Sequence, residues 1–163
     1  TRPAASGAAR MSAVPDPTTP TPANPEHVFP TLTSEQVARL ASHGRVRSIA
    51  SGEVLVEAGA RTSSFFVVTR GQVDVVSPGP GGERVIASFR ARQFTGEANM
   101  LSGRRSISAL RVPEPTELIE IERKDILGLI QTDVQLGEIL MRAFILRRVS
   151  CEVPYGLALA VSA

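Results

Sequence analysis

A glycine, a carboxylate and an arginine lie within ten residues in the segment 96-GEANMLSGRRSIS-108. Residues 97–101 can form a short helix that begins directly after Gly96 and ends near Gly103. The first amide groups of a helix have no intrahelical partners and can bind an anion, and the Arg105 guanidinium can bind the same anion with two hydrogen bonds. The pattern therefore predicts a phosphate-binding site.

Glu97 favours a sugar hydroxyl next to that phosphate. A carboxylate repels a phosphate but accepts a hydrogen bond from a hydroxyl group. Glu97, Arg105 and the hydroxyl of Ser106 together predict one site for a ribose joined to a phosphate, with Arg104 as an additional candidate cation. The alternative interpretation is an ordinary surface ion pair between Glu97 and Arg105.

The elements that must position this segment are predicted to be short strands. Seven segments are rich in β-branched residues and are separated by Gly, Pro or Ser. They are residues 45–50, 53–59, 64–71, 72–78, 83–89, 106–112 and 117–122. This spacing is typical of a sandwich, jelly roll or barrel. Residues 78–83, PGPGGE, are predicted to form an exposed hairpin tip in which Pro and Gly interrupt the strand pairing.

Helical patterns flank the strands. Helices are predicted for residues 34–42, 123–131 and 134–149. Thr33 and Gln36 have capping-box spacing before the first of these helices, and Thr132 and Gln135 have it before the last. The last helix is apolar on almost every side, so we expect it to be buried or to pair with another chain.

The 163 residues predict one domain with two tails. Residues 1–28 are interpreted as a disordered Pro/Ala-rich leader, residues 29–149 as the domain, and residues 150–163 as a tail of a truncated or isolated module. One cysteine and two unclustered histidines predict neither a disulfide nor a metal site, and no cofactor is expected.

Charge and hydropathy suggest where the chain acts. The formal net charge is only +2, and no helix-turn-helix fits after residue 148, so no nucleic-acid partner is expected. No run of 18 apolar residues and no secretory signal pattern occur in the sequence. We therefore expect a cytoplasmic protein without a membrane partner.

Several of these segments resemble the cyclic nucleotide-binding domain family. The resemblance runs from about Phe29 to Arg148 and rests on 66-FVVTRGQVDV-75, 94-FTGE-97 and 105-RSISA-109, together with Gly52 and Gly59. It implies a mainly β fold with flanking helices: a double-stranded, jelly-roll-like β-roll with a short phosphate-cassette helix, an N-terminal helix and two C-terminal helices.

The resemblance also implies roles for individual residues. Glu97 is expected to bind the ribose 2'-hydroxyl and Arg105 the cyclic phosphate, with Gly96, Ala98 and Ser106 completing the ligand site. The chain is then a regulatory module, not an enzyme. It would bind cAMP or cGMP, relay occupancy through the C-terminal helix and form a homodimer through that helix.

An alternative remains open because Arg105 follows Glu97 by only eight residues, fewer than in the commoner cassette of the family. A degenerate domain of the same fold could act as a nucleotide-free dimerisation or docking module. Residues 95–105 and 138–149 further resemble the N-terminal sensor module of bacterial thioredoxin-reductase-like flavoproteins. That resemblance implies a flavin domain as a candidate docking partner.

Overall fold

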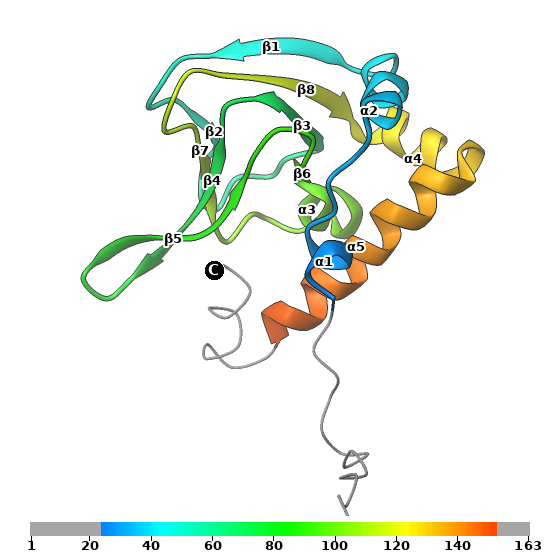
Figure 1. The fold of residues 1–163 in the computed structure, drawn as a ribbon. Helices are drawn as coiled ribbons and strands as arrows, with labels where there is room; N and C mark the ends of the chain where they lie inside the picture. Colours follow the sequence, from blue (N-terminus) through cyan, green and yellow to red (C-terminus); the bar gives the residue numbers. More distant parts are fainter. Residues whose placement is uncertain (1–23, 153–163) are drawn as a thin grey trace, which may run out of the picture.

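The computed structural model describes residues 24–152, except for the side chains of residues 98, 99, 101 and 148–152. Most of the predicted leader and tail, residues 1–23 and 153–163, lies outside the described residues. The described part contains two antiparallel sheets with helices packed against one of them (Figure 1).

Each sheet has four strands. The first sheet has the order β1-β8-β3-β6 and the second the order β2-β7-β4-β5. The strands are β1 (Arg45–Ile49), β2 (Val54–Val56), β3 (Ser64–Arg70), β4 (Val73–Gly79), β5 (Gly82–Phe89), β6 (Phe94–Thr95), β7 (Ala109–Arg111) and β8 (Thr116–Glu122). The predicted β-roll with flanking helices is confirmed.

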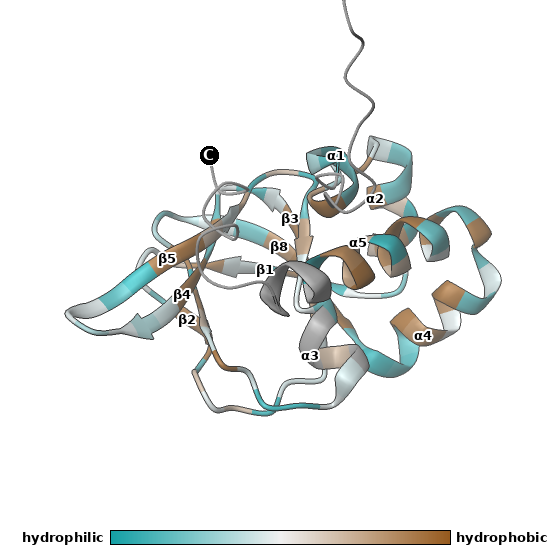
Figure 2. Cartoon of the chain, turned by 90° about the horizontal axis from the view of Figure 1, so that it is seen from below, coloured by the Kyte–Doolittle hydropathy of each residue, from teal (hydrophilic) through white to brown (hydrophobic). Residues whose placement is uncertain are grey.

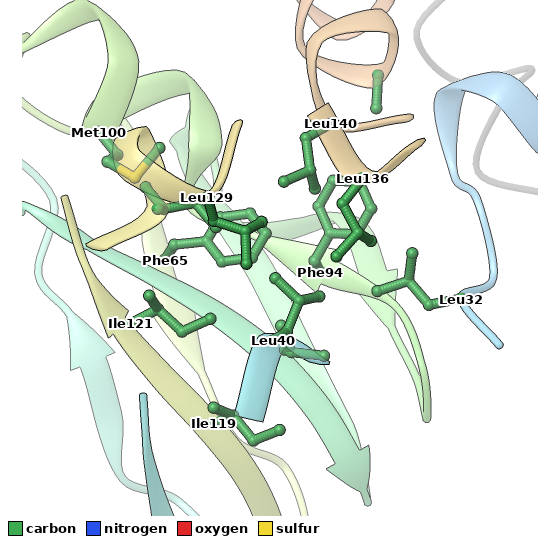
Figure 3. Packing of buried hydrophobic residues seen from close by; sticks show 13 residues of the cluster. Leu32, Leu40, Phe65, Phe94, Met100, Ile119, Ile121, Leu129, Leu136 and Leu140 are labelled. Carbon is green, nitrogen blue, oxygen red and sulfur yellow. The ribbon is translucent and has the colours of Figure 1, made fainter. Parts of the chain in front are cut away.

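Strand β3 of the first sheet is buried on both faces. Alternate residues of a strand point to opposite faces, and in β3 all four residues from Phe65 to Val68 are buried. Phe65 and Val67 pack with the helices, whereas Phe66 and Val68 pack between the two sheets. Figure 3 shows Phe65 and Phe94 beneath side chains of the C-terminal helices. The strand therefore joins two separate cores.

The helices are α1 (Pro25–Val28), α2 (Ser34–Ala41), α3 (Glu97–Ser102), α4 (Arg123–Thr132) and α5 (Val134–Glu152). The capping box of α2 is confirmed. The Gln36 amide N–H donates to Thr33 Oγ1 at 3.2 Å, and the Thr33 amide N–H donates to Gln36 Oε1 at 2.8 Å.

Helix α1 was not predicted. It lies inside the range assigned to the leader, so the ordered part begins before Phe29. Asn24 caps this helix by accepting from the Glu26 amide at 3.0 Å, and Pro25 supplies a favourable first helical residue. Val28 is only 2% exposed, and the burial of its side chain explains how so short a helix is stabilised.

The junction of α4 and α5 differs from the prediction. Thr132 belongs to α4 and donates its hydroxyl to the Gly128 carbonyl at 2.9 Å. Asp133 caps α5 instead, because its Oδ1 accepts from the Leu136 amide at 3.1 Å. One residue, Asp133, therefore separates the two helices.

The tip of the β4-β5 hairpin is where the sequence predicts it, but the predicted interruption of the strand pairing is wrong. Pro78 pairs with Glu83 and Gly79 with Gly82. Beyond Val76, strand β4 has lost its other neighbour β7, so Pro78 lies in a two-stranded ribbon. Such a ribbon tolerates a proline because one edge of the strand needs no hydrogen bonds.

Gly96 joins β6 to α3. Its φ is +93°, and a Cβ atom there would lie 2.8 Å from the carbonyl oxygen of Ser64. Glycine adopts this conformation without steric cost, and its missing side chain lets the turn approach β3.

Gly96→Ala is expected to lower the free energy of unfolding by roughly 1–3 kcal/mol from the strained backbone, plus the cost of moving β3 away from the methyl group. Gly103→Ala, at the other end of α3, is the matched control, because its φ is +67° but no atom lies within 4 Å of the added Cβ. Urea unfolding measures the free energy of unfolding of both variants. Equal losses of unfolding free energy would show that the close approach of Gly96 to Ser64 is unimportant.

The carboxylate of Glu120 on β8 accepts hydrogen bonds from three side chains, two on β1 and one on β3. Ser64 Oγ donates to it at 2.8 Å, and Arg45 Nη2 and Arg47 Nη1 each donate at 3.0 Å. Burial alone raises the pKa of this carboxyl, but the hydrogen bonds from these three side chains and the Arg47 charge together hold the pKa of Glu120 below its ordinary value.

Because the pKa of Glu120 is lower in the folded state, its stabilising contribution is present above the unfolded pKa, about 4.3, and is lost as the pH falls through the folded pKa. The difference in unfolding free energy between wild type and Glu120→Gln should therefore be largest above about pH 5 and should shrink below about pH 4. Glu122→Gln is the control, since Glu122 pairs with Lys124 through side chains that are 66% and 77% exposed. A pH-independent difference for Glu120→Gln would refute this account.

Candidate functional site

The segment singled out in the sequence lies where the strands meet the C-terminal helices. Helix α3 follows β6 directly and contacts both β3 and α5. Figure 2 shows α3 next to α5, with α1 also packed on α5. The segment therefore lies next to β6, β3 and α5.

Glu97 begins α3 and is buried, with 4% of its surface exposed. Its Oε1 accepts a hydrogen bond from Arg147 Nη1 at 2.5 Å, across 50 residues of sequence. Its Oε2 is buried and has no hydrogen-bond partner among the described residues. Glu97 is thus a buried carboxylate with one oxygen engaged and one unsatisfied.

Arg147 projects from α5 into a site composed of acceptors and aromatic rings. Its Nε donates to the Val28 carbonyl at 2.7 Å, and its Nη1 donates to the Phe94 carbonyl at 3.1 Å as well as to Glu97. The guanidinium carbon lies 5.3, 5.0 and 4.8 Å from the ring centroids of Phe29, Phe89 and Phe94. Rings at these distances attract a cation through their faces.

This ion pair is more strongly shielded than a surface pair. The side chains of Arg147 and Glu97 are 10% and 5% exposed. Removing one member of a buried pair typically costs about 3–5 kcal/mol, because the other charge is left without a partner. Loss of either side chain should therefore be strongly destabilising, and the intact pair connects α5 to α3.

Arg105 lies in the loop before β7 and is exposed. Its Nη1 donates to the Gly59 carbonyl at 3.1 Å. The Gly59 amide in turn donates to the Ser106 carbonyl at 2.6 Å, and the Ser106 amide donates to the Ala60 carbonyl at 2.8 Å. These bonds join the second half of the candidate cassette to the loop after β2.

The structure does not pair Glu97 with Arg105. In the described part of the chain Glu97 pairs with Arg147, so the alternative of a surface ion pair between Glu97 and Arg105 is wrong. The two residues border the same region from different elements, one at the start of α3 and one in the loop that follows it. Arg105 itself is exposed.

The remaining predicted site residues have mixed surroundings. Gly96 is buried beneath Ser64, and Ala98 lies in α3 with its side chain outside the described residues. Ser106 is buried and donates its hydroxyl to the Ser108 carbonyl. Arg104 is exposed and its amide donates to Ser102 Oγ at 3.3 Å.

Arg147 is the functional candidate that the sequence analysis missed, although a signal for it exists. Leu136, Leu140 and Ala143 form the buried stripe of α5, and position 147 continues that stripe at helical spacing. An arginine at a core-facing position needs a buried partner. The spacing could therefore have predicted a buried carboxylate opposite Arg147.

Two further features were searched for within the described residues. No group of three His, Cys, Asp or Glu side chains there is arranged to hold a metal ion. Among the helices of residues 24–152, none is both long and apolar enough to cross a membrane.

Residues 46–133 match the family described as the cyclic nucleotide-binding domain. Glu97 and Arg105 lie inside the matched range, and Arg147 lies beyond it. The match spans more than half of the chain.

Two relatives carry related sequences as small parts of longer proteins. Uncharacterized protein Rv0104 of Mycobacterium tuberculosis is 32% identical over 91 residues, which are 56% of this chain and 17% of that protein. The cAMP-dependent protein kinase regulatory subunit of Mycosarcoma maydis is 27% identical over 75 residues, or 46% of this chain and 14% of that protein. The chain thus spans less than a fifth of either relative.

Solved structures share the fold. One, from work on a cyclic-GMP-dependent signalling pathway that regulates bacterial phytopathogenesis, is 28% identical with a TM-score of 0.62, covering 72% of this chain and 94% of that one. The Thermus thermophilus catabolite activator protein is 26% identical with a TM-score of 0.63, covering 76% and 58%. With this fold and a family match over more than half of its length, the chain belongs to the cyclic nucleotide-binding domain family.

Proposed function

We propose that this domain is a regulatory module that binds cAMP or cGMP at the segment beginning with Gly96 and relays occupancy through α5. The observation that carries the proposal is the buried Glu97 carboxylate at the start of α3, whose Oε2 has no hydrogen-bond partner among the described residues. This oxygen can accept a hydrogen bond from a ribose 2'-hydroxyl.

The phosphate half of the site depends mainly on Arg105. Its guanidinium is exposed, and a fork of N–H donors suits a cyclic phosphate. The Ser106 hydroxyl would first have to leave the Ser108 carbonyl, and the Ser106 amide is already bonded to Ala60. Gly96 and Ala98 contribute the backbone around the ribose-binding carboxylate.

Similar proteins support the class of ligand. One relative is the regulatory subunit of a cAMP-dependent kinase, and one similar structure comes from a cyclic-GMP-dependent pathway. These names support cAMP and cGMP equally, so both nucleotides belong in the test.

The second candidate is a nucleotide-free dimerisation or docking module. It is favoured by the engagement of Glu97 with Arg147 and of the Ser106 hydroxyl with Ser108. Helix α5 also exposes the apolar side chain of Ile145 (54%), which a second copy of the chain could cover. The resemblance to thioredoxin-reductase-like fusions makes a flavin domain the other candidate partner.

Calorimetric titration with cAMP and with cGMP tests binding. Arg105→Ala should weaken binding by about 1.5–3 kcal/mol, the range for a hydrogen bond to a charged group. Arg84→Ala, on exposed strand β5, is a matched control that should leave affinity unchanged. An unaltered affinity for Arg105→Ala would move the phosphate contact to Arg104, and no heat with wild type at millimolar ligand would reject nucleotide binding.

Light scattering tests the proposed homodimer. Ile145→Glu should convert a dimer into a monomer, because a charge would be buried in the proposed interface. Val46→Glu, at a 63% exposed apolar position on β1, should leave the mass unchanged. A wild-type monomer at every concentration, or a dimer that persists in Ile145→Glu, would refute pairing through α5.

A further inference from the structure

We infer that Arg147 is a latch that competes with the nucleotide ribose for Glu97, so that ligand binding and the seating of α5 oppose each other. The inference rests on the proposed function, because it concerns what the ribose must displace. It gives a role to a residue of α5 that lies outside the range matched to the family.

The competition follows from the burial of the carboxylate. Arg147 Nη1 lies 2.5 Å from Glu97 Oε1, and Glu97 Oε2 is itself buried. A ribose hydroxyl therefore reaches either oxygen only after side chains around Glu97 move. Displacement of Glu97 or of Arg147 breaks the ion pair.

The seat of Arg147 satisfies two of its three guanidinium nitrogens, Nε and Nη1, whereas Nη2 is buried without a hydrogen-bond partner among the described residues. It offers the Val28 carbonyl, the Phe94 carbonyl and the Glu97 carboxylate, all of them acceptors, and three phenylalanine rings surround the cation. A neutral sugar cannot replace the attraction between the cation and the rings. A ribose that takes this seat therefore displaces the guanidinium of Arg147.

Arg147 joins α5 to three separate elements. Val28 ends α1, Phe94 belongs to β6, and Glu97 begins α3. When the arginine leaves Glu97, α5 loses polar contacts near its C-terminal end while Leu136 and Leu140 remain packed in the core near its start. Occupancy at Glu97 would thus change the position of one end of this helix.

The latch has a defined thermodynamic consequence. If only the unlatched fraction of molecules accepts the ribose, the apparent dissociation constant is the intrinsic one divided by that fraction. A substitution that removes the latch should therefore tighten binding, the opposite of what loss of a ligand contact would do.

The first test compares wild type, Arg147→Met and Arg142→Met in calorimetric titrations with cAMP, cGMP and their 2'-deoxy analogues. Arg147→Met should bind the ribonucleotide about 5- to 150-fold more tightly, the usual range of coupling between sites. The gain should be absent for the 2'-deoxy analogues, which present no hydroxyl to Glu97. Arg142→Met makes the same substitution five residues earlier on α5 and should behave as wild type.

The outcomes separate the two proposals. Equal affinities of wild type and Arg147→Met, or weaker binding by Arg147→Met, overturn the latch and leave nucleotide binding standing. A gain that is equal for ribose and deoxyribose ligands also overturns competition at Glu97. No binding by either protein overturns the proposed function, and the latch falls with it.

A second measurement serves if Arg147→Met does not fold. Glu97→Gln keeps the shape of the side chain but removes its charge, so amide hydrogen exchange in α5 and α1 should accelerate without any nucleotide. Glu138→Gln, at an exposed position on α5, should leave exchange unchanged. Unaltered exchange in Glu97→Gln would show that the pair does not hold the helix and would overturn the latch.

Discussion

A carboxylate buried at the start of α3 needs a positive partner, and this requirement governs how the C-terminal helix meets the β-roll. Glu97 is placed there by the sharp turn at Gly96, which only a glycine makes so close to β3. Because the loop places Arg105 in solvent, the counter-charge comes from α5 instead. The same ion pair therefore determines both how the last helix packs and which groups the candidate site presents.

The rest of the fold supplies a rigid frame for that contact. Strand β3 is buried on both faces, so it is held by the helices on one side and by the second sheet on the other, and β6 packs with the helices through Phe94. Phe94 contributes to this frame twice, since its ring packs in the core and its carbonyl accepts from Arg147. A site whose backbone is this firmly packed can respond to a ligand chiefly through its side chains and the helix that they contact.

Local patterns explain which features could be predicted from the sequence. Alternating apolar residues predicted the strands, and the spacing of Thr33 and Gln36 predicted the start of α2, because both signals arise from neighbours in the chain. The partner of Glu97 lies 50 residues away and could not be chosen from composition alone. The sequence analysis chose Thr132 as the cap of the last helix, because threonine and aspartate are both good N-cap residues. The structure has Asp133 as the cap, since α4 continues through Thr132.

Because a single residue separates α4 from α5, a small backbone rotation at that residue can displace the far end of the last helix. Helix α4 is anchored in the core by Ile126 and Leu129, and Asp133 is the pivot from which α5 departs. At 1.5 Å per residue, Arg147 lies roughly 20 Å along the axis from this pivot. A rotation of about 10° there would sweep the arginine through about 3.5 Å. An adjustment in two or three backbone angles at Asp133 can thus become a displacement as large as a hydrogen bond at the far end of the helix.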